Sequence, residues 1–189
     1  NATEADAQLY DRLAASVIYS NPDLRTDPAI IRSNLRGQSA LWSHSISGDI
    51  PIVLLHIYDE EGIDLARQMV QAHAYWRLTG LSVDLVIWND DHGSYRQVLQ
   101  EEILGLISLE SGGSPGYTKP GNIFVKAADQ LSTEDRILFE SVARVIIHSN
   151  KGSLAGQVNR HYKERSLPAL LEVKETEVVE VQQTLSLPN

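Results

Sequence analysis

One continuous apolar run constrains the fold more than any other feature of this chain. Residues 51–58 read Pro-Ile-Val-Leu-Leu-His-Ile-Tyr, with β-branched side chains and little alternation with polar ones. A strand with successive apolar residues must be buried on both faces, which is typical of a parallel sheet covered by helices. The run is much shorter than the roughly 20 residues that a membrane-spanning helix needs. We therefore predict a core strand and no direct membrane insertion.

Similar runs recur along the chain, and helical patterns separate them. Further strands are expected over residues 82–88, 122–127 and 144–148. Apolar residues at three- and four-residue spacings predict helices over about 60–79, 95–107, 133–142 and 152–163. Four rounds of strand and helix predict an α/β fold. We expect a Rossmann-like three-layer sandwich of about four parallel strands, with helices on both faces and right-handed crossovers.

The chain divides into three predicted parts. Residues 1–49 form a helical lead packed on the core, with an amphipathic helix over 5–19, a short helix over 28–35 and a loop rich in Ser and Gly over 37–49. Residues 50–163 form the α/β core, and residues 164–189 are a linker or an edge segment. The acidic start without methionine or an apolar signal region predicts a processed product or a piece excised from a larger protein.

Composition excludes several classes of function. The formal charge of −9 argues against nucleic-acid binding, which depends on clustered Lys and Arg. Without cysteine, the chain has no thiolate zinc site, iron–sulfur cluster or cysteine nucleophile. Its glycines fit neither the Walker nor the dinucleotide spacing, and the acidic turn at 58–62 would repel a pyrophosphate. We therefore predict no cofactor and no metal.

Polar residues at the strand ends are the first candidates for binding. In an open parallel sheet, ligands bind outside the carboxyl ends of the strands. Carboxylates and amides there could bind sugar hydroxyls or a divalent cation, although such residues also cap helices at the surface. The candidates at these ends are Asp59, Asn89, Asp90, His92, Asn150 and Lys151.

Aromatic residues and histidines give the second group of candidates. Trp42 and His44 share a polar loop, where the indole could stack on a sugar ring or simply pack. His56, His73 and His148 lie within apolar patterns and are predicted to be packed, hydrogen-bonded core residues.

Three blocks of the sequence resemble one family. They are GQSALWSHSISGDIPIV at 37–53, AHAYWRLTGLSVDLVIWN at 72–89 and ARVIIHSNKGSLA at 143–155. Together they resemble a segment of the cyclic β-1,2-glucan synthases, very large bacterial inner-membrane proteins. The resemblance implies a parent that makes periplasmic cyclic β-1,2-glucan from UDP-glucose. This chain looks like an α/β segment next to the phosphorylase-like β-sandwich modules of that parent, at the cytoplasmic face of the inner membrane.

The resemblance brings no catalytic residue to this chain. The family's Asp-x-Asp and Gln-x-x-Arg-Trp transferase motifs do not occur in it. The expected function is therefore a non-catalytic structural or interdomain module whose partners are neighbouring domains. One alternative is a β-glucan-binding module built on Trp42, His44 and the strand ends. The other is a small sugar-active enzyme that uses Asp59, Asp90 and His92.

Overall fold

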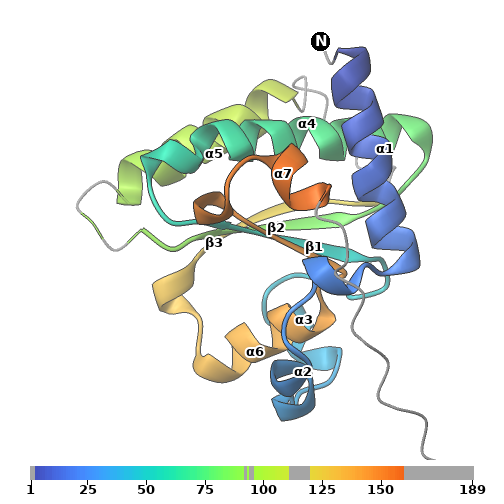
Figure 1. Ribbon diagram of the computed structural model, residues 1–189. Helices are drawn as coiled ribbons and strands as arrows, with labels where there is room; N and C mark the ends of the chain where they lie inside the picture. The colour runs from blue at the N-terminus through green and yellow to red at the C-terminus, as the bar shows by residue number, and fades with distance from the viewer. Residues whose placement is uncertain (1–2, 92, 94–95, 111–119, 160–189) are drawn as a thin grey trace, which may run out of the picture.

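A computed structural model of the chain describes residues 3–91, 93, 96–110 and 120–159. Its centre is a four-stranded, all-parallel sheet in the order β3-β2-β1-β4 (Figure 1). The strands are β1 (Ile52–Ile57), β2 (Asp84–Asn89), β3 (Ile123–Ala127) and β4 (Val145–His148). The predicted Rossmann-like α/β fold is confirmed.

Helices cover both faces of the sheet. The upper face in Figure 1 carries α1 (Glu4–Tyr19), α4 (Ile63–Thr79), α5 (Arg96–Glu110) and α7 (Leu154–Val158). The lower face carries α2 (Pro28–Ser33), α3 (Ser39–Trp42) and α6 (Thr133–Val142). Among the described residues, four short 3-10 helices lie in the connections: η1 (Pro22–Leu24), η2 (Glu60–Gly62), η3 (Ala128–Gln130) and η4 (Ser149–Lys151).

The strand β1 explains why the sheet needs two covered faces. All six of its residues are buried. Val53, Leu55 and Ile57 pack into the apolar cluster of the upper face, whereas Ile52 and Leu54 pack into that of the lower face. Alternate side chains of a strand point to opposite faces, so one apolar run supplies both clusters.

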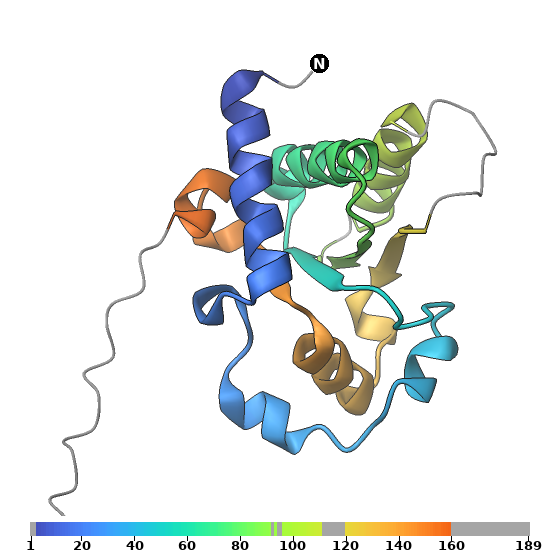
Figure 2. The same cartoon turned by 90° about the vertical axis from the view of Figure 1, so that its right-hand side faces the viewer.

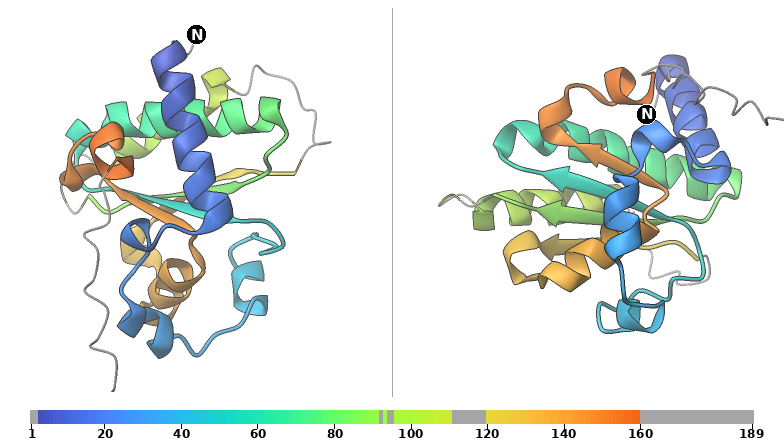
Figure 3. Two further views of the ribbon diagram at one scale, coloured as in Figure 1. Left: turned by 45° about the vertical axis from the view of Figure 1, so that its right-hand side comes forward. Right: turned by 60° about the horizontal axis from the view of Figure 1, so that its bottom comes forward.

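The N-terminal lead connects the two faces. At the upper face, α1 docks on α4, where Trp76 Nε1 donates to the carbonyl oxygen of Tyr10 over 2.9 Å. The chain then passes β4 through η1 and reaches α2, which packs on α6 (Figures 2 and 3). The lead therefore wraps around the β4 edge of the sheet.

Two local predictions need correction or lie outside the description. The segment 37–49, predicted as loop, contains the short helix α3, because Ala40 and Leu41 donate backbone hydrogen bonds to the carbonyls of Gly37 and Gln38. The last helix, predicted over 152–163, spans only Leu154–Val158, because Ser153 caps its start and the chain leaves the helix at Asn159; residues 160–163, like the segment 164–189, lie outside the described residues.

Strand order reverses between β1 and β4. From β1 the chain moves through α4 to β2 on one side, and it later returns through α6 to β4 on the other side. In open α/β sheets, such a reversal opens a crevice at the carboxyl ends of the two strands, where ligands bind. A ligand-binding site is therefore expected first at the carboxyl ends of β1 and β4.

Candidate functional site

Four side chains form a row across the carboxyl end of the sheet. Lys126, Trp88, His56 and His148 come from β3, β2, β1 and β4, and each is the register partner of the next. The row faces α6, because the Trp88 ring meets the ring of Phe139 edge-on with centroids 5.9 Å apart. We call these four residues the carboxyl-end row.

Tyr58, directly after β1, joins the two histidines of the row. Its hydroxyl lies 3.0 Å from His148 Nδ1 and 3.5 Å from His56 Nδ1. The two imidazole centroids are 4.7 Å apart. Burial, together with nearby positive charge, lowers the pKa of His56 to about 3 and that of His148 to about 4. Both rings are therefore neutral at pH 7, and each has one hydrogen-bond donor and one acceptor.

Two buried polar atoms in the row have no hydrogen-bonding partner in the described part of the chain. They are His56 Nε2 and Trp88 Nε1. His56 is 5% exposed, and its ring centroid lies 4.5 Å from that of Trp88. Burying a polar group without a partner costs about 1–3 kcal/mol. His56 is thus buried and hydrogen-bonded as predicted, but only through Nδ1, because Nε2 has no partner in the described residues.

Arg136 of α6 lies over the row. Its guanidinium carbon is 5.8 Å from the Trp88 ring, within the range of a cation–π contact. Its Nη2 atom donates to the carbonyl oxygen of Ala128 and lies 3.5 Å from Asp90 Oδ1. Asp90, a candidate ligand in the sequence, is therefore paired with a cation of the same chain.

The other strand-end candidates are placed differently from one another. The side chain of Asn89 forms hydrogen bonds with the backbone of the following loop. Its Nδ2 donates to the carbonyl of Arg96 over 2.9 Å, and its Oδ1 accepts from the backbone N–H of Asp91 over 3.1 Å. Asp59 and Asn150 are exposed, and Lys151 is exposed at the rim of a cavity beside His148. His92 lies outside the described residues.

Trp42 and His44 point to different surroundings. The Trp42 side chain is 64% exposed, and its Nε1 donates to the carbonyl of Ser47 over 3.3 Å. His44 instead packs edge-on against Phe139, with Nε2 3.4 Å from Asp135 Oδ1. The indole is therefore presented outward, whereas the imidazole fixes the lead to α6.

Sequence reasoning missed Tyr58 and Arg136 as members of a site. Successive side chains of a strand point to opposite faces of the sheet. This alternation could have shown that the last residues on one face are Lys126, Trp88, His56 and His148. That these four are neighbours follows only from the strand order, which the sequence does not give.

The described residues offer neither a metal site nor a membrane-spanning helix. No group of three or more His, Asp or Glu side chains there is arranged to hold a metal ion. In that same part of the chain, no helix is long and apolar enough to cross a membrane.

Comparison with known proteins relates this chain to part of a much larger protein. No family model matches the chain. Over 164 residues, the chain is 32% identical to the cyclic beta-(1,2)-glucan synthase NdvB of Rhizobium meliloti (strain 1021). The chain is distantly homologous to a segment of that synthase. The match covers 84% of this chain and 6% of NdvB, so most of the α/β fold has a counterpart in one short region of a very large protein.

Proposed function

We propose that this chain is a non-catalytic α/β module of a cyclic β-1,2-glucan synthase. It spaces or supports neighbouring domains of the same polypeptide, at the cytoplasmic face of the bacterial inner membrane. The homology to a short segment of NdvB supports this context. The observation that carries the non-catalytic role is the closure of the crevice between β1 and β4.

The loops that follow β1 and β4 contact each other and thereby fill this crevice. The backbone N–H of Tyr58 donates to Ser149 Oγ over 3.1 Å. A Cβ atom on Gly62 would lie 2.9 Å from Ser149 Cβ, so a side chain at Gly62 would force the loops apart. The place where α/β folds usually admit a ligand is therefore occupied by the chain's own contacts.

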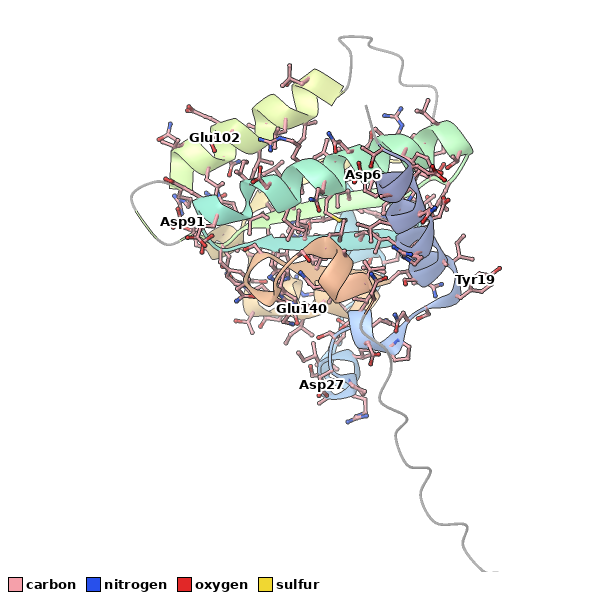
Figure 4. The ribbon with its side chains drawn as sticks, turned by 45° about the horizontal axis from the view of Figure 1, so that its top comes forward. Asp6, Tyr19, Asp27, Asp91, Glu102 and Glu140 are labelled. Atoms are coloured by element: carbon pink, nitrogen blue, oxygen red, sulfur yellow. The ribbon has the colours of Figure 1, made fainter. Side chains whose placement is uncertain are left out.

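Exposed apolar side chains support contact with neighbouring domains. Tyr19, at the end of α1, points away from the body (Figure 4) and is 83% exposed. Leu78, in the last turn of α4, is also 83% exposed. Interdomain interfaces bury such groups. In the complete polypeptide, Tyr19→Ser with Leu78→Ser should lower the output of cyclic glucan without lowering the protein level.

A matched control and an activity test complete this experiment. Asp64→Ser with Arg67→Ser removes an exposed ion pair of α4 and should leave glucan output unchanged. The 189-residue chain alone should turn over neither UDP-glucose nor β-1,2-glucan. Equal output from the two double variants would contradict the interdomain role, and turnover that Asp90→Asn abolishes would contradict the non-catalytic one.

A second candidate function rests on Trp42. An exposed indole fixed by a backbone hydrogen bond is a ready platform for the apolar face of a sugar ring. This observation favours a β-glucan-binding role for the segment around α3. Loss of β-1,2-glucan binding in Trp42→Ala, with an unchanged fold, is the result that would support it.

A further inference from the structure

We propose that the cavity beside the carboxyl end of β4 binds an uncharged, hydroxyl-rich ligand about the size of one sugar ring. We call it the β4 cavity. It measures about 270 Å³ and is lined by polar groups that include Thr26, Glu140, His148 and Lys151. Sites for drug-sized ligands begin at about 300 Å³, so a cavity of this volume suits a smaller molecule.

The walls of the β4 cavity are held in place by hydrogen bonds between the lead and α6. Arg25 Nη2 donates to the carbonyl of Ser141 over 2.9 Å. Ser141 Oγ donates back to the carbonyl of Ile30 over 3.4 Å. Both bonds join segments more than a hundred residues apart in the sequence. The cavity is therefore formed before a ligand arrives, which lowers the entropic cost of binding.

The β4 cavity offers both an acceptor and a ring nitrogen to a ligand. Glu140 Oε2 accepts from Thr26 Oγ1 over 3.3 Å, which leaves Oε1 without a partner among the described residues. Tyr58 contacts Nδ1 of His148, and Nε2 of that ring has no partner in the same part of the chain. Sugar hydroxyls both donate and accept, so a carboxylate oxygen and an imidazole nitrogen can bind neighbouring hydroxyls.

The charges around the β4 cavity favour an uncharged ligand. Arg25 and Lys151 contribute two positive charges, and Asp23, Asp27 and Glu140 contribute up to three negative ones. A phosphate would meet the carboxylates, and a divalent cation would meet the guanidinium and ammonium groups. A neutral polyol meets neither repulsion and can pair with groups of both signs.

The remaining wall is aliphatic. Its side chains are Leu24, Ile30 and Ile146. Sugars present their C–H groups on the faces of the ring and their hydroxyls at its rim, so an aliphatic wall beside polar groups matches both parts of one ring. Hydroxyl-rich linear molecules lack such a face and fit less well.

Tyr58 acts in this site as a positioning residue. Its hydroxyl, 3.0 Å from His148 Nδ1, fixes the orientation of the imidazole and hence the place of Nε2. The neighbouring His56 ring packs behind that of His148, with centroids 4.7 Å apart. The carboxyl-end row thereby connects the buried sheet to the β4 cavity.

Titration of the 189-residue chain with glucose and with sophorose, followed by amide NMR, tests the proposal. Shifts should gather at residues 24–27, 140 and 146–151. Glu140→Gln should weaken binding about tenfold, because a hydrogen bond to a charged acceptor becomes one to a neutral acceptor. Glu134→Gln changes an exposed carboxylate of the same helix and should bind like the wild type.

Each other outcome overturns the site or its chemistry. Saturating sugar without shifts at these residues, or shifts confined to 38–47, would remove the β4 cavity as the binding site. Stronger binding of glucose 1-phosphate than of glucose would show an anion site instead. If the Glu140→Gln spectrum shows an altered fold, His148→Asn replaces it and should weaken binding comparably; wild-type affinity in that variant would overturn the site.

The two sugars separate this proposal from the proposed function. The glucose arm depends only on the chemistry of the β4 cavity. A further titration with β-1,4-linked cellobiose tests the context, because a preference for β-1,2-linked sophorose over cellobiose rests on the proposed glucan-synthase function. Glucose binding without that preference would keep the site and count against the context, whereas a failure of both sugars leaves the interdomain role untouched.

Discussion

The two faces of the sheet use the same strands in different ways. On the upper face, under α1, α4, α5 and α7, the apolar cluster runs the full length of the strands. On the lower face, under α2, α3 and α6, apolar residues fill the amino half and the carboxyl-end row fills the other half. Within β1, Leu55 and Ile57 pack upward while His56 between them faces α6. The upper face therefore buries apolar side chains along the sheet, whereas the lower face also buries a polar ring, His56, near its carboxyl end.

Two buried histidines, one on each face of the sheet, show the same difference between the faces. His73 of α4, 3% exposed, has Nε2 3.0 Å from the carbonyl oxygen of Val83. His56, 5% exposed, has no partner for Nε2 in the described residues. Burial lowers the pKa of both, to about 4 for His73 and about 3 for His56. Burial alone thus does not distinguish a satisfied core histidine from an unsatisfied one.

The largest effect is expected from a truncation in the upper face. Trp76 is fully buried and donates to the carbonyl of Tyr10, so Trp76→Ala removes packing, a hydrogen bond and the docking of α1. The free energy of unfolding should fall by about 3–5 kcal/mol in urea denaturation. Leu78→Ala, in the same helix but exposed, should change it by less than about 0.5 kcal/mol. Similar losses in both variants would contradict the placement of this cluster.

The next effect is a dependence of stability on pH. The folded pKa values of His56 and His148, about 3 and about 4, lie below the ordinary 6.5. As pH falls from 6.5 toward 4, the unfolded chain binds protons that the folded chain does not, so the free energy of unfolding decreases. Each histidine contributes up to about 1.4 kcal/mol per pH unit.

The measurement is urea denaturation between pH 7 and pH 5 for the wild type and His56→Leu. Burial raises the pKa of Asp84 and of Glu140, and these carboxyls act in the opposite direction. They are present in both proteins and cancel in the comparison. The variant should lose less stability on acidification, and parallel profiles would show that His56 titrates normally in the folded chain.

At pH 7, the two histidines should respond differently to leucine. His73→Leu removes the contact with the Val83 carbonyl, so we expect a loss of about 1–3 kcal/mol. His56→Leu removes the unpartnered Nε2 together with only a long, 3.5 Å contact between Nδ1 and Tyr58, and leucine keeps the buried space filled, so stability should stay equal or rise by about 1 kcal/mol. A loss in His56→Leu as large as in His73→Leu would show that Nε2 has a partner, such as an internal water.

Much of the fold could be predicted because each strand carries its own signal. The run at 51–58 required burial on both faces, and apolar residues at three- and four-residue spacings predicted the helices between the strands. The helix α3 escaped prediction because four residues carry no amphipathic period. The lead's path around β4 depends on contacts such as Arg25 with Ser141, which no local pattern encodes.

The candidate site was harder to predict because it depends on strand order. His56 and His148 become neighbours only when β4 lies beside β1, and Glu140 of α6 lines the same cavity as His148. The sequence rules pointed to the loops just beyond the strands. There Asn89 and Ser149 bind backbone atoms of the chain itself. Polar residues in such loops serve ligands and turns alike, so the pattern does not separate the two uses.

The smallest effect on stability is expected at the outer end of the lower face. Trp42→Ala removes an indole that is 64% exposed and has one 3.3 Å hydrogen bond, so the free energy of unfolding should change by less than about 0.5 kcal/mol. Its effect on binding separates the two sugar sites. If the β4 cavity is the site, Trp42→Ala binds glucose like the wild type and Glu140→Gln does not. The reverse order of effects would assign sugar binding to the segment around α3 and would remove the β4 cavity as the site.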